Sequence, residues 1–455
     1  MKTLVRNGRV ALDGKLQALD VLVEGERIAA VGSLGAASAD RVVDAQGCYV
    51  LPGFIDFHTH VDDQIGPYYL ADTYESATRV GLENGITTLC TFVTQEPGDT
   101  LLRGLERARA KAEGRTHADV LWHLTPTTFS PGDLATLRVL QAGGYCTLKL
   151  YTTYKAAGIF ASYDLIEQLF QSLGDLGGCF LVHCEDDELI AAVDARGLDL
   201  SKAFTHTLLR PEAAEVVAIQ RVVDLALKHR ASLHVVHVST LAGAQYLQAN
   251  RAKGDLSFET CPQYLFLDES WLARPDGHRW LCSPPLRGNR APFLELMRQG
   301  AADVLATDHC PFCAAHKDAW DGTDLRQVPN GMPGLGSLPH TAWKLWEGDP
   351  DRAALGLATQ LSLNPARRAG VADRKGALRP GLDADLVVLD PNGPARPLRS
   401  SASDAFESFP GFTSTLAFRE VLLRGESRVR EGQLTQPQTP GGRLLQPSPA
   451  SLALS

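Results

Sequence analysis

An alternation of strand-like and helix-like segments through the middle of the chain most constrains its fold. Strands that alternate with helices in this way form βα units and a parallel sheet. Helical character is clearest over residues 73–84, 101–113, 164–173, 211–229 and 292–298. Eight units in about 320 residues predict an α/β fold, a (β/α)8 TIM-like barrel with loop insertions. The expected strands cover residues 53–60, 87–93, 120–125, 146–151, 179–184, 233–239, 256–260 and 304–308.

The two ends of the chain resemble two parts of one smaller domain. Residues 1–50 hold short strand-like runs, and we expect tight hairpin turns at Asn7-Gly8 and Glu24-Gly25-Glu26. A matching pair of strands is expected at residues 384–390 and 420–425. We therefore predict a small β-sandwich domain formed from both chain termini, residues 1–50 and 371–432. The barrel would take residues 51–370, and residues 433–455 would form an extended or disordered tail.

Composition excludes several classes of partner. Of 455 residues, 44% are hydrophobic and 21% charged, which is typical of a soluble globular protein. A net charge of -9 argues against nucleic acid or an anionic membrane, because no basic excess can neutralise phosphates. We expect neither a signal peptide nor a membrane-spanning segment, since no apolar run approaches the required length. The 9 cysteines are scattered through apolar runs, as reduced thiols of a cytoplasmic protein would be.

One cysteine pair, Cys310 and Cys313, has the CxxC spacing. It could be a redox dithiol, half of a zinc site, or a structural feature without chemistry. No second CxxC exists and no thioredoxin-like context surrounds it, so the structural interpretation is favoured.

The first expected barrel strand runs from Gly53 into two histidines, His58 and His60. Side chains alternate between faces along a strand, so these two histidines would project from the same face at its C-terminal end. Two neutral imidazoles held close together suit a metal ion, most often zinc. A strand end that happens to be rich in histidine is the alternative.

Other expected strands end in residues of the same chemical type. Barrel enzymes carry their chemistry at the C-terminal ends of the strands. Taken singly, each residue has an ordinary explanation: a salt bridge for the lysine, core hydrogen bonds for the histidines, or a helix cap for the aspartate. Six coincidences at five strand ends are hard to accept, so we predict a metal site formed by His58, His60, Lys149, His183, His237 and Asp308.

The lysine needs a separate explanation, because an ammonium group cannot bind a cation. Lys149 lies in an apolar run, where burial lowers a lysine pKa and leaves a nucleophilic amine. Reaction with carbon dioxide would give a carbamate, whose two oxygens can bridge two divalent ions. The sequence suggests this modification only through the residues that surround Lys149.

With these residues in view, the chain resembles the cyclic amidohydrolases, specifically the dihydropyrimidinase and D-hydantoinase family of the amidohydrolase superfamily. The resemblance covers nearly the whole chain. Its motifs lie at residues 53–60, 148–151, 183–185, 237–239, 259–265, 283–287, 307–312, 330–334 and 364–366, with Tyr154 just beyond the second.

This resemblance implies two divalent ions, expected to be Zn²⁺, bridged by N6-carboxylysine at position 149. One ion would take His58, His60, Lys149 and Asp308, and the other Lys149, His183 and His237. The implied reaction is attack of a metal-bridging hydroxide on a ring amide, with Asp308 as proton shuttle.

The resemblance also assigns residues to the substrate. Tyr154 would donate to the developing oxyanion, and Ser283 and Asn330 would hold the imide edge of the ring. A packed aromatic for Tyr154 and ordinary loop hydrogen bonds for the other two are the alternatives.

The implied activity is ring opening of a dihydropyrimidine or a 5-substituted hydantoin. Allantoinase and dihydroorotase activities are alternatives in the same reaction class. A non-catalytic scaffold relative is disfavoured, because all six metal-type positions are present. The resemblance further implies a small-molecule cyclic amide as the partner and a homotetramer as the assembly.

Two segments depart from the family pattern near the expected substrate pocket. Residues 61–69 lack the apolar gate that usually follows the second histidine, and residues 334–339 lack an acidic residue often found there. Dihydroorotase-like enzymes typically carry a carboxylate-binding arginine where this chain has Asp62, followed by Asp63. This acidic pair would repel a carboxylate, so we expect a neutral ring as substrate. Arg287 is the remaining basic candidate, but its motif also occurs in hydantoinases, which act on neutral rings.

Overall fold

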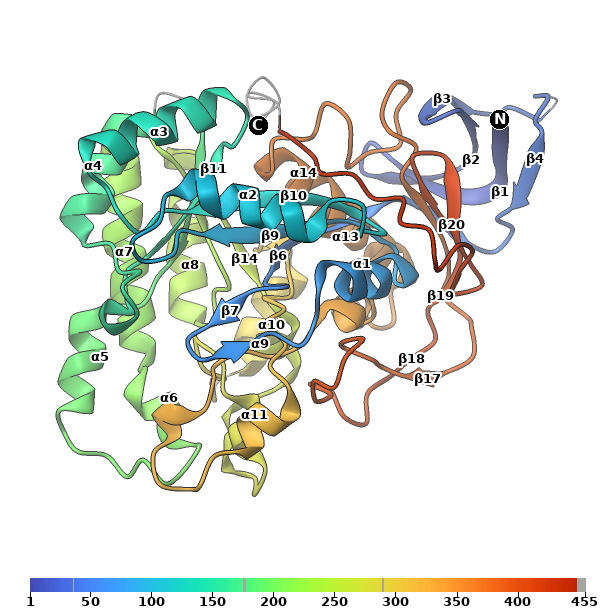
Figure 1. Cartoon of the computed structure of the whole chain (residues 1–455). Helices are drawn as coiled ribbons and strands as arrows, with labels where there is room; N and C mark the ends of the chain where they lie inside the picture. Colours follow the sequence, from blue (N-terminus) through green and yellow to red (C-terminus); the bar gives the residue numbers. More distant parts are fainter. Residues whose placement is uncertain (36, 175–176, 289, 448–455) are drawn as a thin grey trace.

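The eight expected strands form one parallel sheet in the computed structural model, which describes residues 1–35, 37–174, 177–288 and 290–447. Thr59 also pairs in parallel with His309, just beyond the last strand, so the sheet is nearly closed. The predicted barrel is thus confirmed (Figure 1). Its strands, in spatial order, are β6 (Phe54–Thr59), β9 (Ile86–Thr94), β10 (Asp119–Thr125), β11 (Thr147–Tyr151), β12 (Cys179–His183), β13 (Ser232–Val235), β14 (Leu256–Thr260) and β15 (Val304–Leu305).

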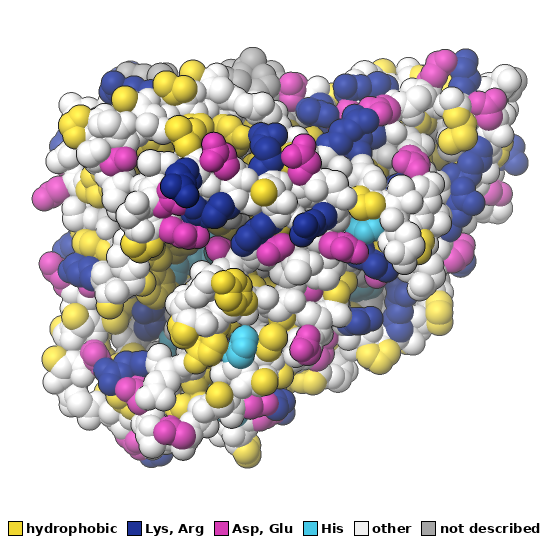
Figure 2. All heavy atoms as spheres, in the orientation of Figure 1, with side chains coloured by type: hydrophobic (Ala, Val, Ile, Leu, Met, Phe, Trp, Pro, Cys, Tyr) yellow, Lys and Arg dark blue, Asp and Glu magenta, His cyan; other side chains and the backbone are white. Residues whose placement is uncertain are grey.

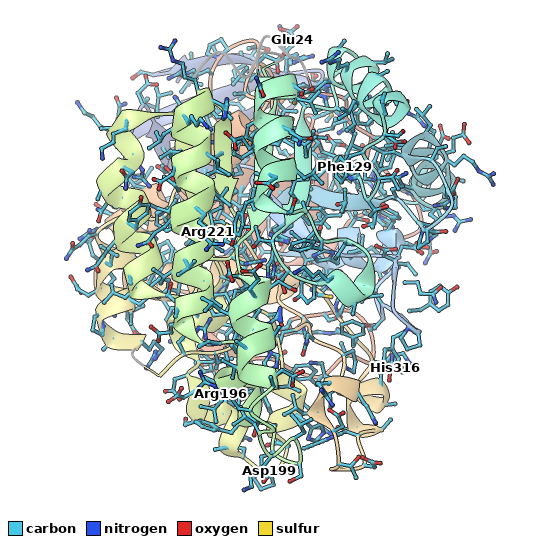
Figure 3. All side chains as sticks on the ribbon, turned by 90° about the vertical axis from the view of Figure 1, so that its left-hand side faces the viewer. Glu24, Phe129, Arg196, Asp199, Arg221 and His316 are labelled. Atoms are coloured by element: carbon cyan, nitrogen blue, oxygen red, sulfur yellow. The ribbon has the colours of Figure 1, made fainter. Side chains whose placement is uncertain are left out.

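Helices in the connections cover the outside of the barrel. Their starts follow from local sequence: Thr73 caps its helix in a capping box with Ser76, and Ser130 does the same with Asp133. Figure 3 shows the helix that carries Arg221 on the outer face of the molecule. These helices are α1 (Tyr74–Glu83), α2 (Leu101–Ala112), α3 (Pro131–Ala142), α4 (Tyr163–Leu173), α5 (Asp187–Asp194), α7 (Glu212–His229), α8 (Leu241–Asn250) and α10 (Arg290–Arg298).

A second sheet of 9 strands combines both ends of the chain. Leu51 of β5 (Tyr49–Pro52) pairs with Val387 of β16 (Leu386–Asp390), which joins the N-terminal strands to the C-terminal ones. The sheet has its own hydrophobic core and fits the predicted β-sandwich, whereas the domain boundaries stay a prediction. Its other strands are β1 (Lys2–Leu12), β2 (Lys15–Glu24), β3 (Arg27–Gly32), β4 (Arg41–Asp44), β19 (Ala417–Leu423), β20 (Glu426–Arg430) and β21 (Gln433–Leu434).

The hairpin predicted at Asn7-Gly8 is wrong. Strand β1 continues through this dipeptide, and its register with β2 shifts between Val5 and Gly8, which marks a β-bulge. Asn7 has φ 64°, a conformation that serves a bulge as well as a turn. The chain reverses instead at Gly14 (φ 72°), and the second predicted turn, at Gly25 (φ 58°), is present.

The described part of the tail begins as β21 in the terminal sheet, and residues 443–445 then lie against the barrel. Val120 of β10 donates to the carbonyl of Arg443 (2.9 Å), and Leu445 donates back to Val120 (2.7 Å). The Leu445 side chain belongs to the hydrophobic cluster inside the barrel. Residues 448–455, where the predicted tail continues, lie outside the described residues. No helix in the described ranges is long and apolar enough to cross a membrane.

Candidate active site

A cavity of about 620 Å³ opens where the barrel strands end. In the space-filling view, the surface is hollowed beside the hairpin of β7 (Gln64–Ile65) and β8 (Tyr68–Tyr69) (Figure 2). The structure brings all nine residues that were predicted to bind metal or substrate into the wall of this cavity. These are His58, His60, Lys149, Tyr154, His183, His237, Ser283, Asp308 and Asn330.

Three of these residues converge on one point. The Nε2 atoms of His58 and His60 lie 3.2 Å and 3.4 Å from Oδ1 of Asp308. One ligand atom from each residue falls within 4.8 Å of the others, an arrangement that can hold a metal ion. Burial favours the neutral acid, but the neighbouring histidines lower the pKa of Asp308 below its usual value, so its carboxylate is ready to act as a ligand.

The other three residues adjoin this group. His183, at the end of β12, and His237, just beyond β13, have ring centres 4.5 Å apart. His237 is also 5.4 Å from the ring of His58. The Lys149 Nζ lies 5.1 Å from the ring centre of Phe92 and 5.0 Å from that of Tyr151. All six metal-type side chains therefore surround one region of the cavity.

Two of these six residues adopt an unusual backbone conformation. His237 and Asp308 have φ 40° and 49°, in the left-handed region that residues with a side chain seldom occupy. Both lie after their strands have ended, so their side chains are directed by the local turn and not by strand alternation. Strain of this kind concentrates at functional sites.

The histidines fit a divalent cation. His58 Nε2 and His237 Nδ1 are buried and have no hydrogen-bond partner among the described residues. Burial, together with the positive charge of Lys149 or of a neighbouring histidine, lowers the pKa of both imidazoles, which keeps them neutral. A buried neutral imidazole with a free lone pair is well suited to bind a metal ion.

Lys149 has the environment expected for modification. It is almost completely buried, and burial lowers its pKa to about 8 despite the opposing charges of Glu259 and Asp308. A larger fraction of the amine is therefore neutral, and thus nucleophilic, than for a lysine in water.

Two carboxylates that orient the histidines were not predicted from the sequence. Glu259 on β14 accepts a hydrogen bond from Nδ1 of His58, from the backbone N–H of His237 (3.2 Å) and from Nε2 of His234 (3.2 Å). These bonds place the His58 hydrogen on Nδ1 and turn Nε2 toward Asp308. A glutamate inside an apolar strand was the available signal.

Glu185 plays the corresponding part for His183. Its Oε2 lies 2.7 Å from Nε2 of His183 and 3.0 Å from Arg210. Burial alone would raise the pKa of Glu185, but Arg210 and His183 lower it to about 2. The carboxylate therefore remains charged and fixes the imidazole.

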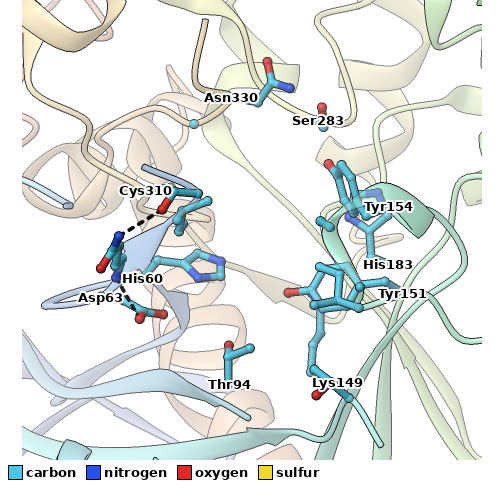
Figure 4. Close-up of a pocket in the computed structure, with 18 of the residues that line it drawn as sticks. His60, Asp63, Thr94, Lys149, Tyr151, Tyr154, His183, Ser283, Cys310 and Asn330 are labelled. Carbon is cyan, nitrogen blue, oxygen red and sulfur yellow. Dashed lines mark hydrogen bonds between the residues drawn. The ribbon is translucent and has the colours of Figure 1, made fainter. Parts of the chain in front are cut away.

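The residues expected to contact the substrate lie at another edge of the cavity, away from His58 and His60. Figure 4 shows Asn330 and Ser283 together, with Tyr154 beside His183. The Tyr154 and His183 ring centres are 5.2 Å apart. The carbonyl of Leu281 accepts hydrogen bonds from Gly331 (2.9 Å) and from the buried Lys317 (2.9 Å), which ties the two loops of this edge together.

The structure corrects the role expected for Asp62. Its side chain accepts from the backbone of Tyr74 (3.4 Å) and approaches Lys111 (3.8 Å), and it does not line the cavity. The next residue, Asp63, lines the cavity instead. Asp62 has φ 52°, so strand alternation no longer applies after His60. Arg287 is buried against Ser239 (3.1 Å) and is also absent from the lining.

Comparisons with known proteins agree with this geometry. The model of the amidohydrolase family matches residues 49–420. The chain is 35% identical to a D-hydantoinase of Streptomyces coelicolor (95% of this chain, 96% of that protein) and 32% identical to a D-phenylhydantoinase of Escherichia coli (96% of each). It superposes on a dihydropyrimidinase from Brevibacillus agri with a TM-score of 0.92 and 29% identity (98% of this chain, 99% of that chain). The chain therefore belongs to the amidohydrolase family, in its group of D-hydantoinases and dihydropyrimidinases.

Proposed function

We propose that this protein hydrolyses a ring amide of a dihydropyrimidine or a 5-substituted hydantoin. The observation that carries the proposal is the set of six metal-type side chains around one cavity, with free ligand atoms on His58 and His237. The names of the relatives, D-hydantoinase and dihydropyrimidinase, support the substrate class.

Two divalent ions, most simply Zn²⁺, would be held by these residues. One would be bound by His58, His60 and Asp308, the other by His183 and His237, with Lys149 between them. When bound, such ions lower the pKa of water and polarise a carbonyl oxygen. The amine of Lys149 would attack carbon dioxide, form an N–C bond and release one proton to solvent, and the resulting carbamate offers two oxygens.

The chain itself would supply proton transfer and charge stabilisation. Asp308, held as a carboxylate, would accept a proton from the attacking water and deliver it to the leaving ring nitrogen. Burial raises the pKa of Tyr154, so its phenol keeps a hydrogen to donate to the carbonyl oxygen as negative charge develops there. Ser283 and Asn330 would bind the imide edge.

The proposal is tested by turnover of dihydrouracil, hydantoin, allantoin and dihydroorotate under identical metal loading. We expect dihydrouracil or hydantoin to give the highest kcat/KM. Dihydroorotate should be slower by about ten- to a hundredfold, since a charge-assisted hydrogen bond contributes about 1.5–3 kcal/mol and no arginine lines the described cavity. Best turnover of dihydroorotate or allantoin would refute the substrate class. No turnover of any ring by metal-loaded protein would refute the activity and favour a scaffold.

Two further expectations rest on family likeness and on cysteine chemistry. We propose a homotetramer, which light scattering of the purified protein would measure directly. All 9 cysteines are free, which favours the cytoplasm as the compartment.

A further inference from the structure

The cavity has a wall that the proposed reaction does not use. It consists of residues 63–66, which follow β6, and residues 94–97, which begin with the last residue of β9. Figure 4 shows Asp63 and Thr94 across the cavity from Ser283 and Asn330. If the ring is held at that edge, as proposed above, a substituent on the ring points toward this wall. A cavity of about 620 Å³ leaves room for a substituent as well as a ring.

Asp63 is the unpaired charge in this wall. Its Oδ1 accepts a hydrogen bond from the backbone N–H of Gln64 (2.8 Å). Its other carboxylate oxygen has no hydrogen-bond partner, and Asp63 forms no ion pair, among the residues that the structure describes. The backbone of Asp63 is fixed, because its carbonyl accepts from Leu70 (3.0 Å) across the β7–β8 hairpin.

The nearby cations are already paired with other groups. Lys111 donates to the carbonyl of Asp62, and Arg107 pairs with Asp99 and with Glu96 (3.2 Å). Neither cation forms an ion pair with Asp63 among the described residues. Burial raises the pKa of Asp63, and the charge of Glu96, which also lines the wall, adds to this, whereas His60 and Lys111 act in the opposite direction.

Gln64 and Ile65, next to Asp63 in the wall, offer a hydrogen-bond acceptor and apolar surface. The amide nitrogen of Gln64 donates to Gly66 (3.1 Å), which leaves its amide oxygen without a partner among the described residues. Ile65 and Ile159 provide apolar surface in the same cavity. This combination matches a flexible carbon chain that ends in a cationic donor. It would repel an anionic substituent and would leave Asp63 unsatisfied against a purely apolar one.

We infer that the substrate ring carries an alkyl substituent ending in an ammonium or guanidinium group, which Asp63 binds. The inference rests on the proposed ring-opening activity and specifies its substrate class. Asp63 acts here as a specificity-determining residue and takes no part in the reaction itself.

The test compares 5-(aminobutyl)hydantoin with 5-pentylhydantoin, which replaces the ammonium group by a methyl group at equal length. For the parent protein we expect kcat/KM to favour the amino compound by about tenfold or more. Asp63→Asn should reduce that ratio by at least about tenfold. The matched control is Asp62→Asn, whose side chain faces away from the cavity and which should leave the ratio unchanged.

If kcat/KM of the parent protein for the amino compound is equal to or below that for the pentyl compound, the inference is overturned. This measurement does not depend on any variant folding. An unchanged ratio in Asp63→Asn, or an equal fall in Asp62→Asn, overturns the assignment to Asp63. Unsubstituted hydantoin and dihydrouracil distinguish failure of the inferred substituent from failure of the proposed activity. If these two rings are hydrolysed but the amino compound is not preferred, only the inference about the substituent is refuted. If no ring is hydrolysed, the proposed function is refuted as well.

Discussion

The two sides of the cavity are built in different ways. On the metal side, His58 and His183 lie at the ends of barrel strands, are buried, and are each oriented by a carboxylate. On the wall that would face the ring substituent, residues 63–66 and 95–97 belong to connections, Thr94 ends β9, and most of these residues are half-buried or exposed. Under the proposed function, chemistry and substrate choice would be carried by separate structural parts. Changes on the metal side should reduce turnover of every ring, whereas changes in the wall should redistribute turnover among rings.

The largest effect is expected for Lys149→Ala. Loss of the proposed bridge between the ions should reduce turnover by about 10³-fold or more for every ring, because metal charge stabilisation contributes several kcal/mol. Lys155→Ala is the matched control, since that lysine is half-exposed and pairs with Asp187 (3.3 Å). Carbon NMR after growth with labelled bicarbonate should show a carbamate signal in the parent that is missing from Lys149→Ala. Its absence from active, metal-loaded parent protein would refute the modification.

The second-largest loss of turnover is expected for Asp308→Asn. The amide keeps the size of the side chain but cannot accept and return a proton, and general acid–base catalysis is worth about 10²–10⁴-fold. We expect at least that loss in kcat, with similar factors for dihydrouracil and hydantoin. A variant with full metal content and turnover within about tenfold of the parent would show that another group transfers the proton.

Glu259→Gln tests the support behind the metal side. Without the carboxylate, His58 loses the acceptor that orients it, and such partners typically change metal affinity by about 10–100-fold. Competition with a chelator would measure this loss. Glu295→Gln, an exposed glutamate on α10, is the control. Unaltered affinity would mean that strand geometry alone positions His58.

Lys317, on α11 (Ala314–Asp318), should have the smallest effect on turnover, because its substitution acts on stability instead. Burial lowers its pKa from 10.5 to about 7, so the unfolded chain binds more protons than the folded protein between these values. Stability of the parent should therefore rise with pH across this window by about 1 kcal/mol per pH unit from this group. Lys317→Met should lack this pH-dependent contribution. The free energy of unfolding of the variant, relative to that of the parent, should therefore fall as pH rises.

Urea unfolding at several pH values would measure the Lys317 contribution. Lys228→Met, at an exposed position on α7, provides the comparison. Parallel pH profiles for the parent protein and Lys317→Met would show that this lysine is not buried as the structure places it.

Sequence patterns were informative where the chain is a regular strand. Alternation along β6 predicted that His58 and His60 share a face, and the barrel rule predicted that Lys149 and His183 come near them. Strand β6 ends at Thr59, so alternation does not place Asp62. Asp62 was expected near the substrate because dihydroorotase-like enzymes carry an arginine at this position, whereas Asp63 lines the cavity.

Contacts between distant segments were not accessible from the sequence. Glu259 reaches His58 across 201 positions of the chain, and Lys317 reaches Leu281 across 36. Asn7-Gly8 illustrates a different limit, because the same dipeptide conformation serves a turn and a bulge. Packing against strand β5 favours the bulge over the turn. A Cβ at Gly8 would lie 2.5 Å from the Val50 side chain, so β1 passes close beside β5 at this point.

The pairing of β5 with β16 has a consequence for biosynthesis. Strands β1 to β5 cannot complete their sheet until the chain has grown past Asp390, and the barrel interior gains Leu445 later still. Pairings between such distant parts of a chain form slowly, and unpaired strands are prone to aggregation meanwhile. The N-terminal strands must therefore stay protected during translation, so the yield of this protein in a cell should depend on chaperones that hold nascent β-strands.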